Sequence, residues 1–347
     1  MRLLVVGAGA IGCWLGHRLV STGHRVTLVG RPAWIEAVRA RGLGLQVGDN
    51  VQRVHDLVAA TDIGTVSGET FDWVFCTVKA YDTLEALRPL SAVVRENTPL
   101  LLVQNGVGGE ELAAQVWPQA LFVSGVVTLA VQALAPGAIC LTTTRGGLAL
   151  AAVSPGAPVE ALADELRRAG LTRLKLYPDY RAVKWSKLLL NMLGNALPTL
   201  LDMPLEALYA HRWAFELERA AFGEALAVMR HLGIGPVSLP GYAVPLFAWA
   251  MARLPGAALQ PLFRRLVIGG RGGKMPSLHL DLARGKPRSE VGFLNGAVAA
   301  HGQALGLPAA VNRALASTLQ AIVSGELSWD EFRGRPERFL SRLDGQF

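Results

Sequence analysis

The chain opens with MRLLVVGAGAIG, residues 1–12, and this stretch decides the fold of the N-terminal half. Residues 1–6 read as a fully buried strand, residues 13–22 as a helix and residues 25–29 as a second strand. A Gly-x-Gly-x-x-Gly pattern between a strand and a helix is typical of dinucleotide binding, because the glycines let a pyrophosphate approach the helix N-terminus closely. The residues predicted to bind it are Gly7, Ala8, Gly9, Ala10, Ile11 and Gly12. The alternative is a glycine-rich turn without a ligand.

The end of the second strand distinguishes NAD from NADP. NAD sites usually place an acid here, which accepts a hydrogen bond from the ribose 2′-hydroxyl. In this chain the strand ends in Val29-Gly30-Arg31-Pro32, without a carboxylate. Arg31 can form charge-assisted hydrogen bonds to a 2′-phosphate. The sequence therefore predicts NADP(H) as the cofactor, whereas the alternative makes Arg31 an ordinary solvent-facing loop residue.

Two further polar residues follow apolar, strand-like segments. Lys79 comes directly after Trp73–Val78, and Asn105 comes two residues after Leu100–Val103. Ligands of open α/β sheets bind at the carboxyl ends of the strands. We therefore expect Lys79 and Asn105 to meet the cofactor or the substrate, although each could be an ordinary loop residue.

The pattern changes from strands to helices near the middle of the chain. Residues 122–150 alternate as β-structure does, residues 158–169 read as a helix, and residues 171–176 read as the closing strand of the sheet. Six helices are expected after that, at residues 184–195, 205–231, 244–253, 261–267, 290–305 and 309–325. The predicted class is α/β, with a dinucleotide-binding domain over residues 1–178 and a helical domain over residues 179–347.

One of these helices carries a polar stripe. In WSKLLLNMLGN, residues 185–195, the polar residues Lys187, Asn191 and Asn195 lie four apart, and the residues between them are almost all apolar. Side chains four residues apart lie on the same face of a helix, so the three form one slanted stripe. Buried amine and amide groups need partners, which suggests a site. The simpler interpretation is a buried helix with one wet edge.

Composition excludes several classes of function. The 347 residues carry a net charge of +7, but the arginines are scattered and no basic run is interleaved with aromatic residues. An anionic small ligand accounts for the charge, and no nucleic acid or membrane partner is expected. The three cysteines show no metal-ligand spacing and read as buried thiols in a reducing cytoplasm. Without that spacing we expect no metal. The chain begins directly with a strand, so we expect no signal peptide.

The chain resembles the ketopantoate reductase (2-dehydropantoate 2-reductase) family along nearly its whole length. The motifs occur in order: GAGAIG, Arg31, CTVKAYD, QNGVG, WSKLLLNMLGN and the tract KMPSLHLDLARGKPRSEVGFLNG at residues 274–296. The resemblance implies a Rossmann-type domain followed by an all-helical domain like that of 6-phosphogluconate dehydrogenase. It also implies reduction of the ketone of 2-dehydropantoate by NADPH to (R)-pantoate, on the route to pantothenate and coenzyme A.

The resemblance also assigns roles to residues. It makes Lys187 the general acid, Asn191 and Asn195 substrate-binding amides, and Asn105 a contact of both cofactor and substrate. Lys79 would meet the cofactor. Ser277 would bind the substrate carboxylate, and Glu290 would contact the cofactor near the lysine. The chemistry fits these assignments, because an alkoxide formed at the ketone must be protonated and a lysine ammonium can do so. By themselves Ser277 could be a helix N-cap and Glu290 a first-turn acid.

The family pattern is not complete. Residues 232–273 form a long, apolar, proline-rich segment, and Gly292 stands where an aspartate is usual. The spacing from Asp281 to Glu290 is one residue longer than usual, and a further family asparagine falls near Leu205. These differences concern the identity of the keto acid. They leave open a related reductase of another 2-oxo acid or an opine-type substrate, or an NADP-binding redox sensor without turnover. The apolar segment also favours a homodimer.

Overall fold

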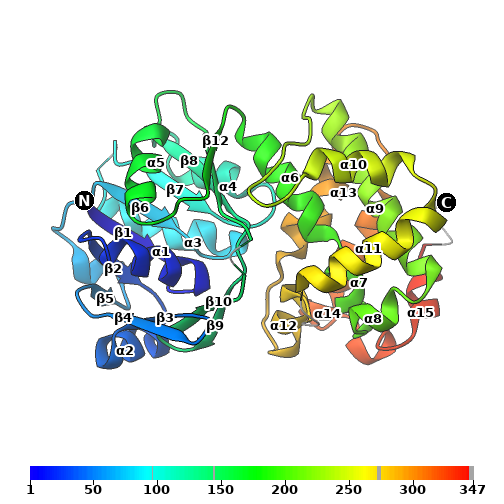
Figure 1. The fold of residues 1–347 in the computed structure, drawn as a ribbon, viewed down its shortest axis with the longest axis horizontal. Helices are drawn as coiled ribbons and strands as arrows, with labels where there is room; N and C mark the ends of the chain where they lie inside the picture. The colour runs from blue at the N-terminus through cyan, green and yellow to red at the C-terminus, as the bar shows by residue number, and fades with distance from the viewer. Residues whose placement is uncertain (96, 144, 272–274, 344–347) are drawn as a thin grey trace. The chain divides into compact units, whose positions relative to one another are not determined.

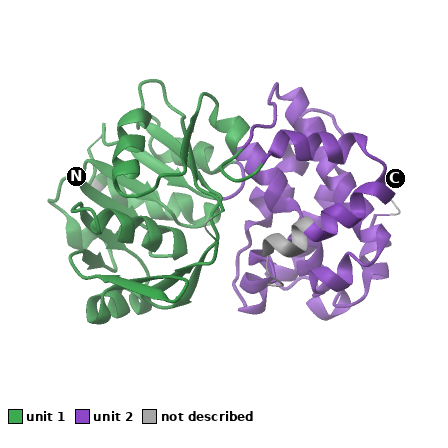
Figure 2. Cartoon of the chain, viewed as in Figure 1, with its two compact units in different colours: residues 1–104, 108–183, 239–242 green, residues 105–107, 184–238, 243–347 purple. Residues whose placement is uncertain are grey.

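The computed structural model describes residues 1–95, 97–143, 145–271 and 275–343. Lys274, the first residue of the tract that resembles the reductase family, lies outside them. The chain divides into two compact units, coloured separately in Figure 2. Unit 1 comprises residues 1–104, 108–183 and 239–242, and unit 2 comprises residues 105–107, 184–238 and 243–347. The units thus separate after Val183, whereas the boundary expected from the sequence lies at residue 178.

Unit 1 is built on an eight-stranded sheet with the order β12-β11-β8-β7-β6-β1-β2-β5 (Figure 1). Its neighbouring strands are parallel except for the antiparallel pair β8 and β11. The strands are β1 Arg2–Val6, β2 Arg25–Val29, β5 Val58–Ala60, β6 Trp73–Cys76, β7 Leu100–Val103, β8 Phe122–Val127, β11 Leu148–Ala152 and β12 Leu174–Tyr177. Continuous apolar strands of this kind need cover on both faces.

Helices supply that cover, and alternate residues of β1 show the two faces. Leu3 and Val5 belong to a core cluster that includes residues of α1 and α5, whereas Leu4 and Val6 belong to a second cluster with residues of α3 and α4. The helices of unit 1 are α1 Ala10–Val20, α2 Pro32–Arg41, α3 Thr83–Leu87, α4 Gly109–Val116 and α5 Val159–Arg168, with short 3₁₀ turns η1 Ile63–Val66, η2 Ala80–Asp82 and η3 Arg88–Ala92. The predicted Rossmann-type α/β unit is confirmed.

A second, four-stranded sheet was not predicted. Its order is β4-β3-β10-β9, and α1 packs against β3, β9 and β10. The strands are β3 Leu43–Val47, β4 Asn50–Val54, β9 Val131–Ala135 and β10 Ala138–Leu141. The expectation of one sheet through residue 176 is therefore wrong for β9 and β10, which lie within the predicted β-structure at residues 122–150. Strand periodicity identifies strands but carries no information on which of two sheets a strand joins.

The described part of unit 2 consists of helices and connecting loops. The helices are α6 Tyr180–Met192 (its first turn in unit 1), α7 Ala196–Leu201, α8 Leu205–Leu208, α9 Arg212–His231, α10 Val244–Arg253, α11 Gly256–Arg271, α12 Ser277–Ala283, η4 Glu290–Phe293, α13 Asn295–Ala304, α14 Ala310–Ser324, η5 Trp329–Glu331 and α15 Pro336–Leu340. Helix α14 packs against α7, α9, α13 and η4 and so forms the centre of the unit. The predicted all-helical second domain is confirmed. The single helix expected over residues 205–231 is two, α8 and α9.

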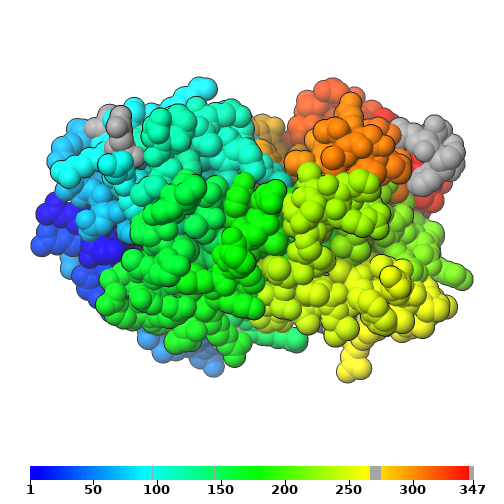
Figure 3. Space-filling model, turned by 90° about the horizontal axis from the view of Figure 1, so that it is seen from above, coloured from blue at the N-terminus to red at the C-terminus, as the bar shows by residue number. Residues whose placement is uncertain are grey.

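Within the apolar segment at residues 232–273, the described residues 232–271 form a loop and two helices, α10 and α11. Large apolar side chains of both helices face outward: Leu246 is 66% exposed, Trp249 53% and Leu262 51%. Helices α10 and α11 carry the yellow colours of Figure 3. No helix among the described residues is both long enough and apolar enough to cross a bilayer.

Two of the three cysteines are buried as expected. Burial raises the pKa of the Cys13 thiol to about 12, and burial likewise raises that of Cys76 to about 12. Cys140 is only half-buried, so the prediction was wrong for this residue. It lies on β10 of the small sheet, whose existence the sequence did not reveal.

Candidate functional site

The glycine loop of unit 1 is tightly packed at its first and third glycines and open at the second. Gly7 has φ +112°, and the Gly7 and Ala8 N–H groups both donate to the Val29 carbonyl, at 2.9 and 3.1 Å. A Cβ on Gly12 would lie 2.1 Å from the Gly7 carbonyl oxygen, whereas a Cβ on Gly9 would meet no atom within 4 Å. Of the three glycines, Gly9 alone therefore leaves its backbone open, as the close approach of a pyrophosphate requires.

The start of α1 is suited to an anion. Gly9 is its N-cap and offers no side chain to the first N–H groups, and the first turn carries no acid. Ala10 and Ile11, the first two helical residues, are partly exposed. Orphan N–H groups and the helix dipole favour a phosphate at such an end. Residues 7–12 thus fit the dinucleotide that the sequence predicted.

Side chains that the sequence reasoning missed fix the neighbouring loop. The Thr77 hydroxyl at the end of β6 donates to the Gly7 carbonyl over 2.8 Å. Nε2 of Gln104, at the end of β7, donates to the Val78 carbonyl at 3.1 Å and to the Thr83 hydroxyl at 2.7 Å. Lys79, half-buried, lies in the segment that these bonds hold. The sequence signal that could have identified Thr77 and Gln104 is a polar residue directly after each buried strand.

Arg31 lies beside the glycine loop. It is the exposed N-cap residue of α2, and the preceding Gly30 packs so closely on the loop that its Cβ would lie 2.2 Å from the Ala8 Cβ. Within the described ranges no carboxylate pairs with the Arg31 guanidinium. The guanidinium therefore keeps its full capacity to bind a phosphate.

In unit 2 the polar stripe is broken. Helix α6 ends at Met192, and Gly194 adopts φ +58°. Both carboxylate oxygens of the buried Glu218 accept from the Gly194 N–H, at 2.8 and 3.0 Å. The spacing predicted that Asn195 lies on one helix with Lys187. The prediction is wrong, because the helix ends before Asn195. The glycine two residues past the last turn was the signal for this end.

Asn195 remains next to Asn191 in spite of the break. It is the N-cap residue of α7 and only 4% exposed. Its Nδ2 donates to the Asn191 carbonyl at 3.0 Å, while its buried Oδ1 has no hydrogen-bond donor among the described residues. A buried acceptor without a donor is unfavourable until a ligand or water supplies one.

Asn105 is brought to α6 by a three-residue turn that belongs to unit 2. Nδ2 of Asn191 donates to Oδ1 of Asn105 at 3.1 Å. Two residues on, the Val107 N–H donates to the Phe293 carbonyl at 2.9 Å, and a Cβ on Gly106 would lie 2.4 Å from the same oxygen. This turn is thus fixed both to α6 and to η4.

Three predicted site residues of unit 2 remain, Lys187, Glu290 and Ser277. Lys187 is half-buried one helical turn before Asn191, and Glu290 is the buried first residue of η4, whose last residue is Phe293. Ser277 is the exposed first residue of α12. No hydrogen bond within the described part of the chain joins Ser277 to the Asn105–Asn191 pair.

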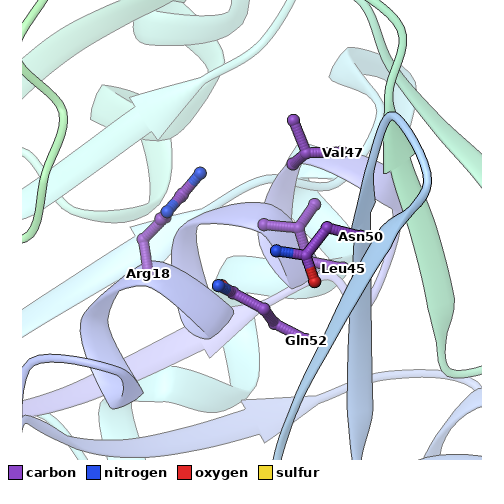
Figure 4. A pocket seen from close by; sticks show the side chains of 5 residues that line it. All are labelled: Arg18, Leu45, Val47, Asn50 and Gln52. Atoms are coloured by element: carbon purple, nitrogen blue, oxygen red, sulfur yellow. The ribbon is translucent and has the colours of Figure 1, made fainter.

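Unit 1 also contains a hollow that does not include the glycine loop. Its volume is about 260 Å³, and Figure 4 shows the side chains that line it, Arg18, Leu45, Val47, Asn50 and Gln52. Arg18 lies in the last turn of α1, at the opposite end of the helix from the glycine loop. The hollow therefore lies at the far end of α1 from the predicted pyrophosphate site.

Two family models together match most of the chain. The ketopantoate reductase PanE/ApbA model matches residues 3–155, and the ketopantoate reductase PanE/ApbA C terminal model matches residues 179–323. The 2-dehydropantoate 2-reductase of Pyrococcus horikoshii is 25% identical over 325 residues, which cover 92% of this chain and 97% of that protein. The enzyme of the same name from Archaeoglobus fulgidus is 28% identical over 327 residues, with 93% and 98% covered.

Solved structures show the same architecture. A PanE/ApbA family ketopantoate reductase from Ralstonia eutropha JMP134 aligns with a TM-score of 0.77 and 29% identity, covering 94% of this chain and 99% of that one. D-mandelate dehydrogenase, solved with NADH and anilino(oxo)acetate, aligns with a TM-score of 0.76 at 20% identity, with 94% and 99% covered. At this lower identity the likeness concerns the fold alone.

Proposed function

Because the chain belongs to the ketopantoate reductase PanE/ApbA family, we propose that it reduces 2-dehydropantoate to (R)-pantoate with NADPH. The observation that carries this proposal is the hydrogen bond between Asn191 and Asn105, one helical turn from Lys187. It joins two residues that the family resemblance assigns to the substrate, and Lys187, the third, lies on the same helix as Asn191. Two amides beside an amine are suited to hold an oxygen-rich anion.

Residues of unit 1 hold the cofactor in this proposal. Gly7–Gly12 and the N-terminus of α1 bind the pyrophosphate, and the open backbone at Gly9 supports this. Arg31 binds the 2′-phosphate, which makes NADPH the preferred form, and Lys79 binds a further polar group of the cofactor. When bound, NADPH supplies the hydride that the ketone carbon receives.

Residues of unit 2 hold and protonate the substrate. The Lys187 ammonium hydrogen-bonds the ketone oxygen, stabilises the negative charge that develops there and donates the proton that completes the alcohol. Glu290, buried at the start of η4, orients this ammonium and contacts the cofactor. Both roles depend on position, so loss of either side chain acts mainly on kcat.

The amides bind the rest of the substrate. Asn191 uses its Nδ2 on Asn105 Oδ1, so Asn191 keeps Oδ1 and Asn105 keeps Nδ2 for the substrate. The buried Oδ1 of Asn195 fits a hydroxyl donor, which 2-dehydropantoate provides. Ser277 binds the carboxylate. The substrate is thus held by complementary donors and acceptors, which contribute through orientation.

A related 2-oxo acid is the second candidate, and Gly292 favours it. The family usually carries an aspartate at this position of η4, and glycine offers no side chain there. The experiment is NADPH oxidation with 2-dehydropantoate and a panel of branched, aromatic and opine-forming 2-oxo acids. A kcat/KM for 2-dehydropantoate at least about tenfold above the others supports the proposal. Preference for another acid supports the second candidate, and tight NADPH binding without any turnover supports a redox sensor.

We also propose a homodimer. Leu246, Trp249 and Leu262 are more than half exposed, and no charged residue occurs between Leu232 and Ala252. An apolar surface of this kind is typical of an interface. Sedimentation of the wild-type chain and of Trp249→Glu tests this, because the substitution should yield a monomer if the surface is the interface.

A further inference from the structure

Asp202 has an unusual backbone conformation. It follows the last residue of α7 with φ +50° and ψ +42°, and it is the only residue other than glycine with a positive φ in the described part of the chain. Left-handed conformation is unfavourable for a residue with a Cβ, although aspartate tolerates it better than most. Such outliers persist where surrounding contacts determine them, and they concentrate at functional sites.

Contacts with two distant segments hold the Asp202 carboxylate. Nε2 of His279, on α12, lies 2.6 Å from Oδ1. From the C-terminal segment, Arg333 donates through Nε to Oδ2 at 2.8 Å, and its Nη2 lies 2.7 Å from the same oxygen. Burial by itself would raise the pKa of Asp202, but the hydrogen bonds from His279 and Arg333 outweigh it and hold the pKa below its ordinary value.

Trp329 completes the group. Its ring lies 5.4 Å from that of His279 between centroids, the Arg333 guanidinium lies 4.9 Å from its ring, and its Nε1 donates to the carbonyls of Thr199 and Leu200 in α7, both at 3.1 Å. We call Asp202, His279, Trp329 and Arg333 the α12 anchor. The anchor joins the end of α7 to α12 by a directional set of bonds.

The two joined helices each begin with a residue of the proposed substrate site. Asn195 is the N-cap residue of α7, and Ser277 is the first residue of α12, two positions before His279. All six residues of α7 are buried, which makes it a rigid connection between Asn195 and Asp202. The anchor therefore determines where Ser277 lies relative to Asn195.

We propose that Asp202 is a positioning residue that, through His279, fixes α12 so that Ser277 can bind the carboxylate of the 2-oxo acid. This inference rests on the proposed function. Simple packing would hold α12 without a strained backbone or a partly buried ion pair, since replacing such pairs by apolar residues is often neutral or stabilising. A directional anchor is what a side chain on a seven-residue helix requires for accurate placement.

Two variants of Asp202 and one control test the proposal. Asp202→Gly relieves the strain of the left-handed backbone and removes the carboxylate that binds His279 and Arg333. Asp202→Asn keeps one acceptor oxygen and tolerates the left-handed conformation. We expect KM for the 2-oxo acid to rise at least about tenfold in Asp202→Gly and less in Asp202→Asn, with kcat and KM for NADPH within about twofold of wild type. Asp330→Asn is the matched control, because Asp330 pairs with Arg333 at 3.1 Å but is 80% exposed and does not contact His279. An unchanged KM in Asp202→Gly overturns the proposal.

A double-mutant comparison separates positioning from general stability. In a Ser277→Ala background, Asp202→Gly should cause no further rise in KM, because the side chain that it positions is already absent. Additive effects on KM would show that Asp202 acts by another route and would overturn the proposal.

Hydrogen exchange supplies a readout that needs no turnover. Amides of α12 should exchange at least about tenfold faster in Asp202→Gly than in wild type, while those of α14 and all amides of Asp330→Asn stay unchanged. Unchanged exchange in α12 overturns the anchor itself. If α12 loosens but the wild-type chain reduces no 2-oxo acid, the anchor stands, and both the proposed function and the role assigned to Ser277 fail.

Discussion

Nδ2 of Asn191 donates a hydrogen bond to Oδ1 of Asn105 over 3.1 Å, although 86 residues separate the two in the sequence. The bond joins Asn105, in the turn at residues 105–107, to α6, the helix that carries Lys187. Since the Val107 N–H also donates to the Phe293 carbonyl, the same turn is fixed to η4, which begins with Glu290. Three sequence motifs thus meet in unit 2.

The amide pair should behave as a coupled unit. Asn105→Ala and Asn191→Ala should each raise KM for the 2-oxo acid by about tenfold, because each leaves the other amide without its partner and removes one substrate contact. The double variant should be less impaired than the product of the single effects, since part of each loss is the shared bond. Steady-state kinetics of the four proteins measures the coupling. Strictly multiplicative effects would show that the two amides act independently.

Arg31 should set the choice between NADPH and NADH. Arg31→Ala should weaken NADPH binding by about 10–100-fold and leave NADH binding within about twofold, because only NADPH carries the 2′-phosphate. Arg41→Ala, at the other end of the same helix, removes an equal charge and serves as control. Fluorescence titration with both nucleotides measures the effect. Equal losses for both nucleotides would contradict the assignment of Arg31.

Gly9 and Gly12 should respond differently to the same added methyl group. Gly12→Ala places a Cβ 2.1 Å from the Gly7 carbonyl, so it should lower the melting temperature by several degrees. Gly9→Ala meets no protein atom within 4 Å, so the fold should keep its melting temperature while NADPH affinity falls at least about tenfold. Thermal melts and nucleotide titrations test both. An unchanged affinity in Gly9→Ala would mean that the pyrophosphate does not approach this backbone.

These glycines also show why part of the molecule could be predicted from sequence. The strand, glycine loop and helix at the N-terminus are determined by residues within one local stretch, and the family motifs give the order of the remaining site residues. By contrast, the pairing of β3 with β10 and the contact of Asp202 with His279 join segments far apart in the chain, at separations that no local pattern reveals. The end of α6 was missed because apolar spacing was followed through Gly194, whose positive φ stops the helix.

The α12 anchor should make stability depend on pH in the acid range. The pKa of Asp202 is held below its ordinary value of 3.8 by His279 and Arg333, against the opposing effect of burial. A carboxyl with a lowered pKa stabilises the fold above its ordinary pKa, and this contribution is lost as the pH falls through the lowered value. The free energy of unfolding of wild type should therefore exceed that of Asp202→Asn at pH 6, and the difference should shrink below about pH 4. Chemical denaturation at several pH values measures it, and a difference that grows toward acid would contradict the account.

The rate of NADPH oxidation with 2-dehydropantoate, measured for the wild-type chain and for Lys187→Ala, tests the central claim most directly. We predict steady turnover by the wild type and a kcat at least about 100-fold lower in Lys187→Ala, with NADPH affinity unchanged, because the proton donor is lost but the cofactor site in unit 1 is intact. Lys175→Ala, an exposed lysine on β12, should keep full activity and serves as control. Absence of turnover in the wild type, or a Lys187→Ala variant that keeps most of its kcat, would contradict the claim.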